Sequence, residues 1–195
     1  GENPYKEDQP FTIISCSGLI PLKRVNLIAD ILSCISDIKL NWIHFGDGPE
    51  SVSIEKKISG LPSNINVELK GQVTNSEIKK FYKTHPVHLF ITTSSTEGLP
   101  VSIQEAISFG IPVLATDVGG MKEVVQNNSG RLLNKDFDSV QAAEIMKEML
   151  TGETNTALFR KGVREFWEKN FNAEKVYSDF AEELLSIHQD PDLNS

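Results

Sequence analysis

The sequence predicts an α/β fold, a Rossmann-like parallel six-stranded sheet with helices on both faces. From Phe11 onward, short apolar runs bounded by turn residues alternate with amphipathic stretches, as in repeated strand-helix units. Each run is short enough for one strand of a buried parallel sheet. The length of 195 residues suits a single domain, and 39% hydrophobic with 24% charged residues is typical of a globular chain.

The strands are expected where the apolar runs are rich in β-branched and aromatic residues. In chain order they are FTIISC (11–16), NWIHFG (41–46), INVELKG (65–71), VHLFITT (87–93), PVLAT (112–116) and GRLL (130–133). Every crossover between consecutive runs has room for a helix, as a parallel sheet requires.

The helices are expected where apolar residues recur with helical spacing between and after these runs. The predicted helices cover 23–36, 49–59, 75–84, 100–109, 119–126 and 138–150, followed by 154–169 and 172–188. Asn75 and Asp138 are the expected caps of two of them. Pro49 and Pro100 are placed as first helical residues, where a missing N–H costs nothing.

The chain is expected to divide into three segments. Residues 1–10 are polar with two prolines and are expected to be a linker outside the fold. Residues 11–170 form the expected Rossmann-like domain. Residues 171–195 are expected to form a helix that packs across the domain, followed by a tail.

Composition argues against several classes of partner. Lys and Arg total 19 against 27 Asp and Glu, and the net charge of −8 disfavours binding to nucleic acid or to an anionic membrane surface. No apolar run approaches the roughly 20 residues that span a bilayer, and the first residues resemble no signal peptide, so a cytoplasmic location is expected. The two cysteines and four histidines show no metal-ligand spacing, so no protein-bound metal is predicted.

The loop after the first strand, SGLIPLKR, brings two cations to the expected start of the first helix. Lys23 and Arg24 lie there beside backbone N–H groups that already carry partial positive charge. A bound diphosphate would offset the repulsion between them and use the free N–H groups. The alternative is two solvated side chains.

Two glycine-containing loops follow other strands. Gly46 and Gly48 flank Asp47 after the second strand, and Gly119 and Gly120 follow the fifth. Glycine at these positions allows a backbone to approach a ligand closely. A plain strand-to-helix turn needs the same residues, so that alternative stays open.

The loop TEGLPVSIQEA places two carboxylates at the start of one helix. Glu105 falls between Val101 and Phe109 on a largely apolar helix, so its carboxylate should be partly buried and needs partners, such as the two hydroxyls of a ribose. Glu97 in the preceding loop can reach a sugar, and Gly98 lets the chain approach a phosphate. The alternatives are a structural carboxylate at 105 and a solvated one at 97.

From about Phe11 to Ile187 the chain resembles the group 1 glycosyltransferases, family 4, of the GT-B fold. The resemblance rests on landmarks in a fixed order, namely the first-strand loop ending in Lys, the GDGP turn, Gly-Gln-Val at 71–73, the E-x7-E segment, and GIPVLATDVGGMKEVV. It implies the C-terminal, nucleotide-sugar-binding half of such a fold. The acceptor-binding N-terminal domain of the same enzyme is then an expected partner outside this sequence.

The resemblance also implies roles for individual residues. Lys23 would bind the donor diphosphate and Glu97 would lie near the transferred sugar, and these two are the expected catalytic residues. Glu105 would hold the ribose. The further expected substrate-binding residues are Gly18, Arg24, Gly46, Asp47, Gly48, Val73 beside the base, Gly98 and Leu99 through their backbones, Pro100 and Val101.

One position departs from the family pattern. The family usually has Arg five residues before its helix-start Lys, as a second cation for the diphosphate, whereas this chain has Gly18 there. Arg24 is the candidate to compensate for it.

The activity implied is transfer of a sugar, with retention, from a nucleoside-diphosphate sugar to an acceptor hydroxyl in polysaccharide or glycoconjugate synthesis. The hexosyltransferase would need no metal or other cofactor, and the full-length enzyme could sit peripherally at the inner membrane face, although no membrane contact is expected from this domain. The fragment alone would be inactive for lack of the acceptor domain. A non-catalytic nucleotide-binding module and a nucleotide-sugar epimerase of the same architecture remain alternatives.

Overall fold

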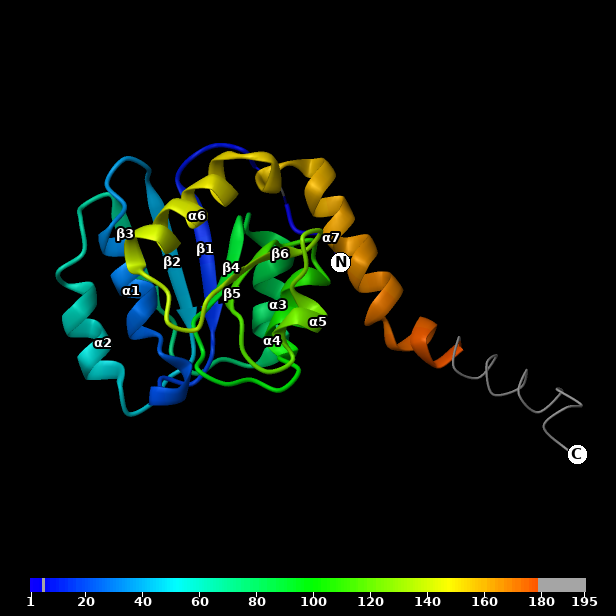
Figure 1. Cartoon of the computed structure of the whole chain (residues 1–195), viewed down its shortest axis with the longest axis horizontal. Coiled ribbons are helices and arrows are strands. Elements are labelled where there is room, and N and C mark those ends of the chain that lie inside the picture. The colour runs from blue at the N-terminus through cyan, green and yellow to red at the C-terminus, as the bar shows by residue number, and fades with distance from the viewer. Residues whose placement is uncertain (5, 179–195) are drawn as a thin grey trace, which may run out of the picture.

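A six-stranded, all-parallel sheet forms the centre of the protein in a computed structural model, which describes residues 1–4 and 6–178 (Figure 1). The strand order is β3-β2-β1-β4-β5-β6, which confirms the predicted fold class. The strands are β1 Phe11–Cys16, β2 Leu40–Phe45, β3 Ile65–Leu69, β4 Leu89–Thr92, β5 Val113–Thr116 and β6 Gly130–Leu133. Three of them end one to two residues earlier than the sequence predicts, which lengthens the loops at the carboxyl edge.

Helices cover both faces of this sheet (Figure 1). One face carries α1 Asn26–Ser33, α2 Ser51–Ile58 and α6 Ser139–Thr151. The other carries α3 Asn75–Thr84, α4 Val101–Ile107, α5 Met121–Val124 and α7 Ala157–Asn170. Two short 3-10 helices, η1 Pro21–Lys23 and η2 Glu153–Asn155, precede α1 and α7.

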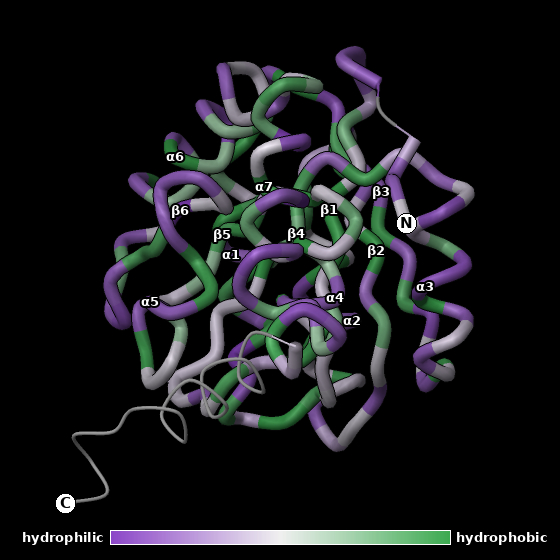
Figure 2. The backbone as a smooth tube through the Cα atoms, turned by 90° about the vertical axis from the view of Figure 1, so that its right-hand side faces the viewer, coloured by the Kyte–Doolittle hydropathy of each residue, from purple (hydrophilic) through white to green (hydrophobic). Residues whose placement is uncertain are grey.

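The alternation of side chains along the strands builds one core on each face. In β1, Ile13 packs into the core beneath α1 and α6, and Ile14 packs into the core beneath α3 and α4. Both are fully buried. Figure 2 shows the hydrophobic residues gathered along the central strands and the hydrophilic ones on outer helices and loops.

The predicted first helix, 23–36, is interrupted near its start. Arg24 adopts a left-handed conformation with φ of 47°, which ends η1, and α1 begins at Asn26. Lys23 therefore lies at the end of a 3-10 turn rather than at the start of an α-helix. The position of Lys23 at the carboxyl edge of the sheet is unaffected.

Other helix starts also differ from expectation. Thr74, not Asn75, caps α3, because Thr74 and Glu77 form a reciprocal capping box. Asp138 caps α6 as predicted. Pro100 is the extended residue before α4, and α2 begins two residues after Pro49.

The predicted helix 119–126 shortens to the four residues of α5. Gly119 has a φ of 54°, and Val125 is extended. Gln126 and Ser129 then form a turn through the bond from Gln126 N to Ser129 Oγ. These local bonds replace helical ones at both ends of the segment.

The first residues pack onto the domain, so the prediction of a linker over 1–10 is wrong for its start. Asn3 is 8% exposed, and its amide donates to Tyr82 O at 2.5 Å and to His85 O at 2.8 Å. Its Oδ1 accepts from Val87 N and from Arg160 Nη2. A polar side chain that reaches four partners offers no hydrophobic signal in the sequence, which explains the error.

The far end of the chain is described only in part. Residues 173–178 are helical and exposed, and they continue outward beyond α7 (Figure 1). The rest of the expected C-terminal helix, from 179 on, lies outside the described residues. Across the described part of the chain, every helix is too short or too polar to cross a bilayer.

Candidate functional site

The two strands at which the order of the sheet reverses are β1 and β4, and they are hydrogen-bonded neighbours (Figure 1). Ligands of open parallel α/β sheets bind outside the carboxyl ends of strands at such a point. The loops that leave this point are 17–24 after β1 and 93–100 after β4. They carry the two residues that the sequence singles out as catalytic.

Lys23 and Glu97 meet between these loops. Lys23 Nζ lies 2.5 Å from Glu97 Oε1, although 74 positions separate the residues in sequence. The two side chains are 27% and 14% exposed, so the pair is shielded but reachable from solvent. The structure therefore brings the two predicted catalytic residues together, in a pair that is neutral overall.

Ser94 completes this cluster, and the sequence did not predict it as a site residue. Its hydroxyl donates to Glu97 Oε1 at 2.6 Å, and its side chain is fully buried. With no nucleophile motif around it, the serine gives no signal as a nucleophile. Ser94 lies two residues beyond the end of β4 and three residues before Glu97. This position is the one sequence feature that indicates a positioning role for Ser94.

Hydrogen bonds to backbone carbonyls tie the two loops to each other. Ser95 N donates to Leu22 O at 2.8 Å, and Thr93 Oγ1 donates to Arg24 O at 2.8 Å. The η1 turn is thus anchored on the loop after β4 on either side of Lys23. This anchoring fixes the distance between Lys23 and Glu97.

Arg24, the expected substitute for the cation missing at Gly18, is part of the same scaffold. Its guanidinium donates to Thr93 O at 2.7 Å and to Lys135 O at 2.9 Å, and a longer contact reaches Ser94 O. Only 18% of the side chain is exposed. Nε and Nη2 are engaged with these carbonyls, and Nη1 lies 4.0 Å from Asp136 Oδ1, so the guanidinium is held by protein groups.

The Gly-Asp-Gly loop after β2, where a ligand contact is predicted, packs against the loop after β1. A Cβ on Gly46 would lie 1.9 Å from Ser17 O, and one on Gly48 would lie 2.5 Å from Leu19 O. The Asp47 carboxylate accepts from Gly48 N at 2.7 Å within the loop. These glycines let two loop backbones pack against each other at the carboxyl edge.

The pair Gly119 and Gly120 supports the Glu97 loop in the same way. A Cβ on Gly119 would lie 1.8 Å from Glu97 O, and one on Gly120 would lie 2.8 Å from Gly98 O. A Cβ on Gly98 itself would meet nothing within 4 Å, and the residue is exposed. The Cα of Gly98 therefore faces open space at the surface of the loop.

Glu105 lies at the other end of this surface, where α4 packs beside α3. Its side chain is 16% exposed, in agreement with the predicted partial burial. Asn75 Nδ2 donates to Oε1, and Lys79 Nζ lies 3.5 Å from that oxygen. Both partners come from α3, and the helical pattern gave no signal for either.

The remaining predicted residues line the edges of the surface. Leu99 and Val101 are 47% and 65% exposed at the start of α4, and Pro100 between them is buried. Val73 is half-buried against the core at the entrance to α3. Exposed apolar side chains beside polar groups suit a ligand with both a ring and charged groups.

Cys16 and His44 lie beneath the site and are held uncharged. Burial, and next the Glu105 carboxylate, raise the pKa of the Cys16 thiol to about 11. Burial lowers the pKa of His44 to about 4. The neutral imidazole bonds to Ser15 Oγ at 2.8 Å and to Ser17 O at 3.1 Å, which braces the loop after β1.

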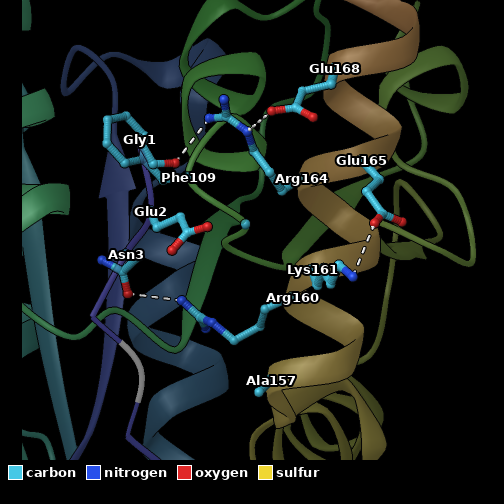
Figure 3. Close-up of a pocket in the computed structure, with 11 residues that line it drawn as sticks. Gly1, Glu2, Asn3, Phe109, Ala157, Arg160, Lys161, Arg164, Glu165 and Glu168 are labelled. Carbon is cyan, nitrogen blue, oxygen red and sulfur yellow. Dashed lines mark hydrogen bonds and ion pairs between the residues drawn. The ribbon is translucent and has the colours of Figure 1, made fainter.

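A cavity of about 550 Å³ lies elsewhere, between the first residues and α7, near the start of β5 (Figure 3). Two arginines that line it donate to other lining residues. Arg160 Nη2 donates to Asn3 Oδ1 at 2.8 Å, and Arg164 Nε donates to Glu168 Oε1 at 2.7 Å. Within residues 1–4 and 6–178, no three His, Cys, Asp or Glu side chains are grouped to hold a metal ion.

Comparisons with known proteins identify the family of the chain. The family model described as "Glycosyl transferases group 1" matches residues 2–166. The gpi3 subunit of phosphatidylinositol N-acetylglucosaminyltransferase from Schizosaccharomyces pombe is 25% identical over 93% of this chain and 41% of its own length. The O-antigen biosynthesis glycosyltransferase WbnH of Escherichia coli is 34% identical over 66% of this chain and 35% of its own length.

Solved structures show the same fold. The lipopolysaccharide outer core galactosyltransferase WaaB aligns with a TM-score of 0.79 at 20% identity, over 94% of this chain and 51% of that one. Anabaena Alr3699/HepE in complex with UDP aligns with a TM-score of 0.72 at 22% identity, over 90% of this chain and 49% of that one. The chain thus spans about half or less of these proteins.

Proposed function

The chain belongs to the group 1 glycosyltransferases, and on that premise we propose that it is the donor-binding, C-terminal domain of a retaining hexosyltransferase of family 4. The observation that carries the proposal is the convergence of Lys23, Glu97 and Ser94 at the switch point of the sheet. A phosphate-binding cation and a sugar-binding carboxylate are held there within hydrogen-bond distance of each other. The open backbone at Gly98 and the carboxylate of Glu105 continue the same surface.

The donor is a nucleoside-diphosphate sugar, and each part of it has a matching group. The diphosphate takes Lys23 as its counter-charge, which stabilises the charge that develops on the leaving group. Glu97, held by Ser94, faces the transferred sugar. Glu105 accepts from the ribose hydroxyls, and Val73 borders the base. The reaction proceeds without a metal, because Lys23 and backbone N–H groups carry the leaving-group charge.

The acceptor site belongs to the N-terminal domain of the complete enzyme. The chain spans 41% of the fission yeast relative, which leaves room for such a domain. The complete enzyme transfers the sugar to an acceptor hydroxyl with retention, in polysaccharide or glycoconjugate synthesis, on the cytoplasmic side. The fragment alone binds the donor and does not turn it over.

Calorimetric titration of this chain with UDP and UDP-sugars tests the binding. Lys23→Ala and Glu105→Ala should each weaken binding by about 1 to 3 kcal/mol, because each removes a charged hydrogen-bonding group. Lys57→Ala is the matched control, since Lys57 pairs with Asp30 at 2.6 Å on the helices of the opposite face. Unchanged affinity in both site variants would contradict the proposal.

Product analysis with the complete enzyme separates the activities. Transfer of sugar to an added acceptor supports the glycosyltransferase. Conversion of the nucleotide sugar to an epimer without an acceptor would instead assign an epimerase, and binding without turnover would assign a regulatory module.

A further inference from the structure

The Glu105 carboxylate is held from one side by two residues of α3. Asn75 Nδ2 donates to Glu105 Oε1, and Lys79 Nζ lies 3.5 Å from the same oxygen. Asn75 and Lys79 are four residues apart on a helix, so they project from one face of α3. Glu105 belongs to α4, and the two contacts therefore join neighbouring helices at the edge of the site.

The start of α3 leaves the Asn75 side chain available for this contact. The cap is made by Thr74 and Glu77, whose backbone and side-chain groups bond reciprocally. The capping box also fixes the backbone at Asn75, so the Asn75 side-chain amide extends toward Glu105 from a backbone held in one conformation. Thr74 directly follows Val73, which is half-buried beside the same helix start.

We propose that Asn75 and Lys79 are positioning residues that aim the Glu105 carboxylate at the ribose of the donor, an inference that rests on the proposed function. The hydrogen bond from Asn75 and the Lys79 cation 3.5 Å away both act on Oε1 and restrict the rotation of the carboxylate. Oε2 is then directed to accept from the ribose hydroxyls. One segment, from Val73 to Lys79, then serves two parts of the nucleotide. Val73 borders the base, and Asn75 and Lys79 orient the carboxylate that binds the ribose.

Nucleotides that lack the ribose hydroxyls provide the test. The probe is whichever of UDP, GDP, ADP and CDP binds this chain tightest by calorimetry, compared with its 2′,3′-dideoxy form. Asn75→Ala and Lys79→Met should each weaken binding of the ribonucleotide by about three- to tenfold, because one removes a hydrogen bond to the carboxylate and the other removes its neighbouring cation. The dideoxy form should bind these variants and the unaltered chain equally, because it offers Glu105 no hydroxyl.

Matched variants on the same helix control for effects on α3 itself. Ser76→Ala and Lys80→Met change exposed neighbours and should leave both affinities unchanged. Lys79→Arg keeps a cation near Glu105 and should restore most of the loss seen in Lys79→Met. Asn75→Asp places a second carboxylate against Glu105 and should weaken ribonucleotide binding further than Asn75→Ala does.

The outcomes separate this proposal from the one it rests on. An equal loss for the ribonucleotide and the dideoxy form, or no loss in either α3 variant, overturns the positioning role. If Glu105→Ala weakens ribonucleotide binding while the α3 variants do not, the positioning role alone fails. If none of the four nucleotides binds, or if Glu105→Ala and Lys23→Ala are both silent, the donor-binding function fails and the positioning role with it.

Discussion

Gly18 is the residue at which this site departs most from its family pattern, and the structure shows room for a side chain there. A Cβ on Gly18 would meet Asp47 O at 3.7 Å, an ordinary contact, and the residue is exposed. The Arg24 guanidinium is held by the carbonyls of Thr93 and Lys135. The diphosphate would therefore be held with less positive charge than the family pattern provides.

Gly18→Arg should strengthen binding of a nucleoside diphosphate to this chain. A second cation beside Lys23 adds a charge-assisted hydrogen bond, worth about 1 to 2 kcal/mol at a partly exposed site. Calorimetry in low and high salt checks both the gain and its electrostatic origin. Gly18→Gln, which has a comparable length and no charge, is the control, and an equal gain from it would refute the electrostatic explanation.

Arg24→Ala should lower stability in the absence of any ligand. The variant leaves the carbonyls of Thr93 and Lys135 without their donor and keeps a left-handed φ of 47° at a non-glycine residue. The free energy of unfolding should fall by about 1 to 3 kcal/mol in urea titration. Arg131→Ala, at an exposed pair with Glu148, should cost less than about 1 kcal/mol. Equal costs would argue against the scaffold role.

The sequence predicts the site residues that follow a known spacing, but it does not predict the residues that hold them in place. Lys23, Glu97 and Glu105 stand in a recognisable order along the chain. Ser94, Asn75 and Lys79 act through contacts across 3, 30 and 26 positions, with no motif to announce them. A contact made between two helices depends on how the helices pack, and the sequence of either helix does not specify that.

The loops at the carboxyl edge form one packed unit, because the backbone of each loop lies against the backbone of another. The Gly119 loop meets the Glu97 loop, and the Gly46 loop meets the one that contains Ser17 and Leu19. The sequence predicts turns at these glycines, but it does not say whether a ligand or another loop fills the space. Here another loop fills it, and rigidity of the site follows from that packing.

Gly119→Ala should therefore disturb both the fold and the site. The new Cβ would lie 1.8 Å from Glu97 O at a φ of 54°, so either the α5 loop or the Glu97 loop must move. Unfolding free energy should drop by more than about 1 kcal/mol, and binding of nucleotide should weaken at temperatures where the chain stays folded. Gly162→Ala is the control, since that helical glycine has nothing within 4 Å and its replacement should be neutral or stabilising. Equal behaviour of the two variants would contradict the packing explanation.

For the whole molecule, the alternation of strand and helix predicted the parallel sheet, its six strands and the edge at which the site lies. These features follow from hydrophobic periodicity, which is encoded locally. The attachment of the first residues through Asn3 was not predictable in this way. It depends on Tyr82, His85, Val87 and Arg160, which approach one another only after the sheet and α7 have formed.

Two buried histidines should make the stability of the whole domain depend on pH. Burial lowers the pKa of His44 to about 4, and burial followed by the charge of Arg160 lowers that of His88 to about 4, against an ordinary value of 6.5. Between these values the unfolded chain binds more protons than the folded one. Stability is therefore complete above about pH 6.5 and falls as the pH drops toward 4, by up to about 1.4 kcal/mol per pH unit for each histidine.

Urea unfolding at about pH 7.5, 6.5, 5.5 and 5.0 measures that slope. Lowered pKa values at Asp37 and Glu77 act mainly below their ordinary values of 3.8 and 4.5, so they contribute little here. His88→Gln should roughly halve the slope at the cost of some overall stability, whereas His85→Gln, at an exposed position, should preserve it. A slope that stays the same in His88→Gln would mean that the histidine is already charged in the folded protein, and its burial against Thr12 N would then need another explanation.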